Sequence, residues 1–130
     1  MDTQRFLIRV SASGEREAVS VPAGAVPHEM LSALLHTDVT ERLRIPVRPA
    51  EWSGEQPLCY LIDARSGDRC LPVNRIGTCF YLTGCPVCGD LLIGSSTDDP
   101  AQTAFYGFAA PEKDLLLAWL NEQFPADEQF

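Results

Sequence analysis

The sequence contains one pair of cysteines at the spacing of a metal site, in the segment Cys85-Pro86-Val87-Cys88-Gly89. Two thiolates separated by two residues can bind the same zinc ion, and a glycine after the second lets backbone N–H groups turn towards sulfur. A structural zinc site needs four ligands. The others would come from Cys70 or Cys79, or else from Cys59, His28 or His36. Because the sequence has no second pair of this kind, the alternative interpretation is an ordinary turn built on a proline and a glycine.

The pattern of Cys85 and Cys88 is also similar to the Cys-Pro-x-Cys of glutaredoxin-like redox proteins. In that family the motif follows a strand and opens a helix, whose N-terminus lowers the pKa of the thiol. Residues 89–94 of this sequence are too short a segment, and too typical of a strand, to form that helix. The sequence therefore disfavours redox catalysis.

Other enzyme signatures are missing from the sequence, which has no Gly-x-Ser-x-Gly elbow, no glycine-rich phosphate loop and no His-Glu-x-x-His. His28 beside Glu29, and His36 near Asp38, could serve acid–base chemistry. Both histidines lie at the ends of one short amphipathic segment, where surface and capping roles are expected. A small enzyme with a cysteine nucleophile is a further alternative, because a cysteine and a histidine can meet in the folded chain. We expect a non-enzymatic protein without a cofactor, with zinc as the alternative.

The net charge of −8 is concentrated in the second part of the chain. Residues 1–75 hold ten acidic and nine basic side chains, whereas residues 76–130 hold eight acidic side chains and a single basic one, Lys113. A negative field repels the nucleic-acid backbone, so we expect no direct binding of DNA or RNA. We expect a protein partner with a basic surface, which would meet the carboxylates of Asp90, Asp98, Asp99, Glu112, Asp114 and Glu122. The alternative is that the negative charge only keeps the protein in solution.

The spacing of apolar residues predicts an α+β fold with a mostly antiparallel sheet. Residues 4–10 alternate in polarity as a strand does, and residues 16–21 would return as the second strand of a hairpin. Helices are predicted over residues 27–36 and from Pro111 onwards, each with a proline at its start and a broad apolar face. Further strands are predicted over residues 42–47, 58–63, 69–73, 78–83, 90–93 and 103–108.

The length of 130 residues is typical of one domain, so residues 1–130 are expected to share a single core, with a frayed tail at 125–130. No apolar run approaches the ~20 residues of a membrane helix, and the first residues lack the pattern of a secretory signal. Five cysteines, an odd number, suit free thiols in a reducing compartment. We therefore expect a cytoplasmic protein that does not contact membranes.

Two segments of the second half, 72–78 (Pro-Val-Asn-Arg-Ile-Gly-Thr) and 86–94 (Pro-Val-Cys-Gly-Asp-Leu-Leu-Ile-Gly), resemble a family of small uncharacterised domains. Members of that family occur largely in phages, mobile elements and their high-GC bacterial hosts. The acidic surface predicts a small interaction or inhibitor module, and the resemblance adds that its target would be a basic surface of a host nucleic-acid-binding protein. The resemblance carries over no active site. In the family pattern the proline and the glycine recur, which would make Cys85 and Cys88 incidental.

Overall fold

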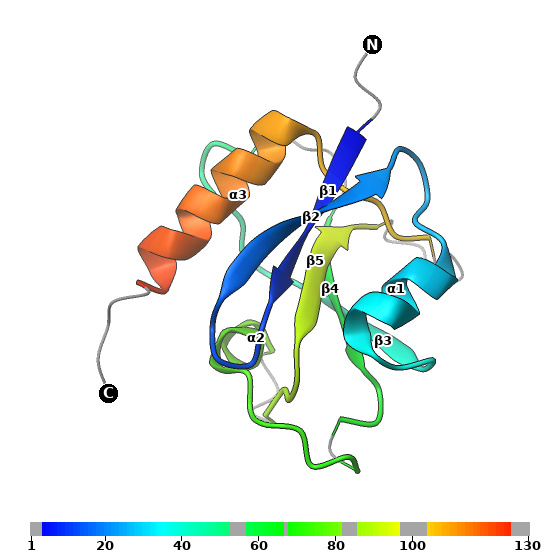
Figure 1. The fold of residues 1–130 in the computed structure, drawn as a ribbon. Coiled ribbons are helices and arrows are strands. Elements are labelled where there is room, and N and C mark those ends of the chain that lie inside the picture. Colours follow the sequence, from blue (N-terminus) through cyan, green and yellow to red (C-terminus); the bar gives the residue numbers. More distant parts are fainter. Residues whose placement is uncertain (1–3, 53–56, 67, 82–85, 97–103, 126–130) are drawn as a thin grey trace.

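The strands of this protein form one antiparallel sheet with the order β2-β1-β5-β4-β3 (Figure 1). The computed structural model describes residues 4–52, 57–66, 68–81, 86–96 and 104–125. The first two strands are the predicted hairpin, and β5 lies between β1 and β4 at the centre of the sheet. The strands are β1 (Gln4–Val10), β2 (Arg16–Pro22), β3 (Thr40–Arg44), β4 (Leu58–Asp63) and β5 (Leu91–Ser95).

Helices lie on both faces of this sheet, and its central strands β1, β4 and β5 bury apolar side chains on both sides (Figure 1). The helices are α1 (His28–Leu35), α2 (Arg75–Phe80) and α3 (Ala110–Gln123). Because side chains alternate along a strand, Ile8 packs in one core cluster with Leu116 of α3, while Leu7 packs in the other with Leu31 of α1. The predicted α+β domain, with one helix after the hairpin and one near the end of the chain, is confirmed. Of the predicted frayed tail, only Pro125 is among the described residues.

The two predicted helices begin and end as their sequences indicate. Pro27 precedes α1, which ends at His36 in the left-handed conformation, and the Thr37 N–H donates to the Ser32 carbonyl at 3.1 Å. At the start of α3, the Glu112 carboxylate accepts a hydrogen bond from the Ala109 N–H at 3.3 Å. Within the described part of the chain, no helix has both the length and the apolar character needed to span a membrane.

Residues 78–83 were expected to form a strand, and this prediction is wrong because their described part lies mainly in helix α2. The Asn74 side chain accepts a hydrogen bond from the Gly77 N–H at 3.0 Å, which is the bond of a helix N-cap. The Thr78 hydroxyl also donates to the Asn74 carbonyl at 2.8 Å. These polar bonds outweigh the strand preference of the aromatic residues that follow. The signal that the prediction overlooked is an asparagine three residues before a glycine.

Two other predicted strands are replaced by irregular structure. Residues 69–73 close a turn in which the Leu71 N–H donates to the Ser66 carbonyl at 3.1 Å, with Cys70 in the left-handed conformation. The described part of 103–108 makes only isolated bridges, such as those from Tyr106 to Ser95 and from Phe108 to Phe6. The strand expected at 42–47 begins and ends earlier, as β3. A proline at each of positions 46 and 49 removes donors that a longer strand would need.

The side chain of Asn74 joins three parts of the chain that are distant in sequence. It is fully buried, and its amide nitrogen lies 3.3 Å from the Val10 carbonyl and 2.9 Å from the Gly89 carbonyl. Its backbone N–H donates to the Val87 carbonyl at 2.7 Å. Val10 ends β1 and Gly89 precedes β5, so the asparagine holds α2 against the point where these two central strands meet.

Replacing Asn74 with alanine is expected to lower the free energy of unfolding by about 2–4 kcal/mol, because several buried carbonyl and N–H groups lose their partner. Urea denaturation measures this change. An Asn74→Asp variant keeps the oxygen that caps α2 but places a carboxylate oxygen against carbonyl oxygens. Wild-type stability in that variant would show that the cap alone matters and that the amide donors contribute nothing.

Tyr60 places a hydroxyl inside the core cluster that contains Ile8 and Leu116, on the α3 side of the sheet, which we call the α3-side core. The residue is fully buried, and its hydroxyl donates to the Gly77 carbonyl of α2 at 3.0 Å. Burial raises the pKa of Tyr60 well above its usual range, and the nearby Tyr81 and Glu41 raise this pKa further. The neutral phenol is therefore the form that the folded protein holds.

Replacing Tyr60 with phenylalanine is expected to cost about 1 kcal/mol near neutral pH, because the hydrogen bond to α2 is lost. A tyrosine in the unfolded chain ionises at about pH 10, whereas Tyr60 in the folded protein stays neutral there. The contribution of Tyr60 to stability is therefore fully present below that pH and falls as the pH rises further. Urea denaturation at a series of pH values should thus show the stabilities of wild type and Tyr60→Phe converging above about pH 10. A difference that stays constant over this range would contradict the assignment.

Candidate functional site

The cysteines of the predicted zinc site are only partly described by the structure. Cys85 lies outside the described residues, whereas Cys88 is half-buried and Cys70 and Cys79 are exposed free thiols. In the described part of the chain, no group of three or more histidine, cysteine, aspartate or glutamate residues is placed to hold a metal ion. The zinc site therefore stays a prediction.

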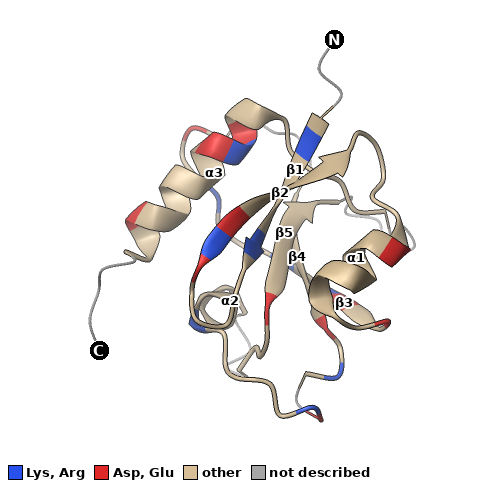
Figure 2. Cartoon of the chain, viewed as in Figure 1, with Lys and Arg blue, Asp and Glu red and all other residues tan. Residues whose placement is uncertain are grey.

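The carboxylates of the predicted acidic surface are divided between the two faces of the sheet (Figure 2). Asp90 lies on the α1 side, where it forms an ion pair with Arg9 at 3.1 Å and accepts a hydrogen bond from the Ala12 N–H at 3.0 Å. Glu112, Asp114 and Glu122 belong to α3 on the other side, and Asp98 and Asp99 lie outside the described residues. The described members of this set are thus not brought together on one surface.

Asp63, at the end of β4, is the organising residue of a different polar region. Asp63 is only 2% exposed. The carboxylate accepts hydrogen bonds from the Thr37 hydroxyl at 3.0 Å and from the Arg65 N–H at 2.9 Å, and it forms an ion pair with the guanidinium of Arg69. An aspartate beside a turn commonly bonds to the backbone of that turn, which accounts for the bond to the Arg65 N–H alone. The available signal for the rest was an acidic residue at the end of an otherwise apolar strand.

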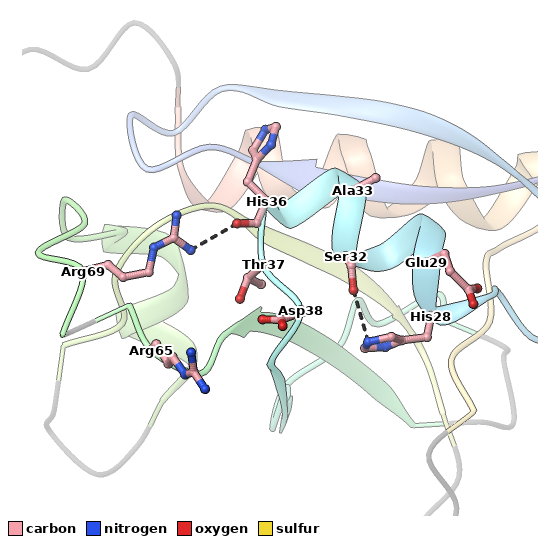
Figure 3. A pocket seen from close by; sticks show the side chains of 9 residues that line it. All are labelled: His28, Glu29, Ser32, Ala33, His36, Thr37, Asp38, Arg65 and Arg69. Carbon is pink, nitrogen blue, oxygen red and sulfur yellow. Dashed lines mark hydrogen bonds between the residues drawn. The ribbon is translucent and has the colours of Figure 1, made fainter.

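Arg65 and Arg69 lie next to each other on the turn that follows β4. The Arg69 N–H donates to the Arg65 carbonyl at 3.0 Å, which is the spacing of one helical turn and places the two side chains on the same side. The Arg69 Nη1 atom also donates to the His36 carbonyl at 3.1 Å, at the end of α1 (Figure 3). Arg69 therefore joins the end of α1 to the end of β4, with its orientation fixed by buried Asp63.

Helix α1 provides the opposite wall of a pocket above this turn. His28 and Ser32 are one helical turn apart and point towards each other, with the His28 Nε2 and Ser32 Oγ atoms 3.2 Å apart (Figure 3). We call the space between α1 and the turn that carries Arg65 and Arg69 the α1–turn pocket. It has a volume of about 800 Å³ and is lined by His28, Glu29, Ser32, Ala33, His36, Thr37, Asp38, Arg65 and Arg69.

The lining of the α1–turn pocket carries charged groups of both signs. It includes two arginines and the carboxylates of Glu29 and Asp38, and buried Asp63 already neutralises one of the arginines. Protein interfaces likewise have rims with many hydrogen-bonding groups.

No protein-family model, curated protein or solved structure matches this chain. The function is therefore inferred from the residues and their geometry.

Replacing Asp63 with asparagine is expected to lower the free energy of unfolding by about 1–3 kcal/mol, because an amide would face the Arg69 guanidinium in place of a carboxylate. Asp68, an exposed aspartate in the same turn, supplies the matched control, and Asp68→Asn should leave stability within about 0.5 kcal/mol of wild type. Urea denaturation of both variants gives the comparison. Equal stability of the two variants would refute the organising role of Asp63.

Proposed function

We propose that this protein is a non-enzymatic binding module that recognises another protein through the α1–turn pocket. The observation that carries the proposal is the fixed guanidinium of Arg69 beside the exposed guanidinium of Arg65, opposite the hydroxyl and imidazole groups of α1. Side chains that are already held in place lose less conformational entropy on binding. A partner surface with acidic and basic groups would meet the arginines and the carboxylates of this pocket respectively.

An interaction module is still expected, but with a different contact surface. Two carboxylates of the expected acidic surface already pair within the chain, Asp90 with Arg9 and Asp114 with Lys113. The more specific role, an inhibitor of a nucleic-acid-binding protein, stays a prediction. The cytoplasm is the proposed compartment, supported by the free thiols of Cys70, Cys79 and Cys88.

The arrangement of nucleophiles and bases supports binding without catalysis. The two histidines line the α1–turn pocket, whose lining holds no cysteine. Exposed Cys79 lines a different pocket, and the lining of that pocket includes no histidine. A cysteine nucleophile needs a base within hydrogen-bond reach, and neither of these two linings combines a described cysteine with a described histidine. Ser32 does contact His28, but on an exposed helix surface, where solvent weakens the electrostatic stabilisation that a reaction would need.

A matched pair of alanine substitutions tests which surface the partner uses. Ala33 and Ala118 are both exposed helical alanines, the first in the α1–turn pocket and the second on the outer side of α3. We expect Ala33→Arg to weaken partner binding at least about tenfold, because a long charged side chain would fill the pocket. Ala118→Arg should leave binding unchanged. Affinity purification of both variants from the native host, with quantitative mass spectrometry of the retained proteins, measures the effect.

The opposite result also has a definite meaning. If Ala118→Arg abolishes binding and Ala33→Arg does not, the acidic side of α3 is the docking surface and the proposal is wrong. If both variants retain every partner of the wild type, neither surface takes part. Thermal melts of the two variants verify that each is folded.

A further inference from the structure

A second pocket lies on the other side of the sheet, between the β1–β2 turn, helix α2 and the end of α3. It has a volume of about 320 Å³, at the lower end of the usual size of ligand sites. Apolar groups from Ile76, Phe124 and Pro125 form part of its lining, together with the thiol-bearing residue Cys79. We call this space the Arg16 pocket, because Arg16 lines it at the point where the hairpin meets α3.

Arg16 is held in this wall by neutral acceptors. Its Nη1 atom donates to the Asn121 Oδ1 atom at 2.5 Å, and its Nη2 atom donates to the Phe124 carbonyl. Its Nε atom is buried and has no hydrogen-bond partner. Burial lowers the pKa of Arg16, since desolvation is not offset by a nearby carboxylate. A buried donor left without an acceptor is costly and is rare in folded proteins.

The carboxylates around the hairpin serve a different arginine. Arg9, on the neighbouring strand, has Asp90 at 3.1 Å and Glu17 at 3.7 Å, whereas no ion pair joins Arg16 to a carboxylate of the described residues. Glu15 is the one described acidic residue that lines the Arg16 pocket, and it is exposed. Arg75 of α2 also lines this pocket. The lining thus combines the guanidinium of Arg16, which has no ion pair with a described carboxylate, with apolar groups.

We propose that the Arg16 pocket binds a small organic monocarboxylate, whose anionic group meets the guanidinium of Arg16 and whose apolar part contacts Ile76 and Phe124. A guanidinium and a carboxylate form charge-assisted hydrogen bonds, which are stronger than the bonds Arg16 makes to neutral acceptors. The single carboxylate matches the single guanidinium of Arg16, whose described acceptors are all neutral. This site is separate from the α1–turn pocket, so the two proposals can fail independently.

The chain contains its own probe and its own control for this site. Cys79 lines the Arg16 pocket, whereas Cys70, also exposed, ends the turn after β4 and is not among the lining residues. Alkylation by iodoacetamide, followed by mass spectrometry of the two cysteine peptides, reports the accessibility of each thiol separately. Benzoate is the test ligand, and benzamide is its uncharged analogue of the same shape.

Benzoate is expected to slow the alkylation of Cys79 at least about threefold relative to Cys70, and benzamide to have little effect at the same concentration. NMR titration of the labelled full chain should show shift changes centred on residues 12–16, 75–79 and 124–125. Arg65→Gln, which removes a guanidinium from the other pocket, should leave benzoate binding unchanged. Arg16→Gln should abolish binding, and its thermal melt verifies that α3 is still docked.

Three results would overturn the proposal. Equal protection by benzoate and benzamide would show that the carboxylate is not recognised. Shift changes that are absent, or that are spread over the whole surface, would show that the pocket is not a site. Binding of benzoate only after Asp127→Asn and Glu128→Gln would show that the chain's own acidic residues, rather than an external ligand, occupy the pocket.

Discussion

The buried amide of Asn74 is the interaction on which the arrangement of this fold depends. It caps α2, contacts the end of β1 and contacts Gly89, two residues before β5, so it determines where the two central strands and the short helix meet. The packing around Gly77 is close, because a Cβ atom there would lie 2.8 Å from Leu91 of β5 and 2.9 Å from Val87. Residues 72–78 and 86–94 are the segments that join the sheet to α2.

A second polar centre, around Asp63, performs a similar task at the same end of the sheet, where β4 ends beside the start of β5. There the buried carboxylate joins β4 to the end of α1 and to the turn that carries two arginines. Both centres use one buried polar side chain with several partners in place of a large apolar contact. Buried polar groups with all partners satisfied specify one arrangement of the chain, because any other arrangement leaves them unpaired. The difference is that the Asn74 centre is closed to solvent, whereas the Asp63 centre forms the floor of an open pocket.

The sequence predicted the parts of the fold that depend on local periodicity. The hairpin, β4, β5 and the two longer helices have patterns that extend over several residues, and each was located to within a few positions. The prediction failed where one polar contact outweighed the pattern, as at α2, where the Asn74 cap replaced an expected strand. It also failed where the chain makes only isolated bridges to the ends of central strands, as Tyr106 does to Ser95 of β5.

The candidate sites were less accessible to sequence reasoning than the fold. Arg69 and His36 are separated by 33 residues, and Arg16 and Asn121 by 105, so no local pattern could indicate that they would meet. The charge count predicted a surface of carboxylates, but a count contains no information on which arginine neutralises which acid. Asp90 illustrates this, because its partner Arg9 lies 81 residues away on the neighbouring strand.

The distribution of aromatic rings between the two cores has a practical consequence. Both tryptophans of the chain pack against the α3-side core, where Trp119 stacks on Phe80 with ring centroids 6.0 Å apart and Trp52 meets the edge of Phe108 at 5.6 Å. The core cluster on the α1 side of the sheet, which contains Leu7 and Leu31, holds no tryptophan among its described members. Intrinsic fluorescence therefore reports on one layer of the molecule, and a loosening of α1 alone would leave the emission spectrum unchanged while the far-ultraviolet dichroism decreased.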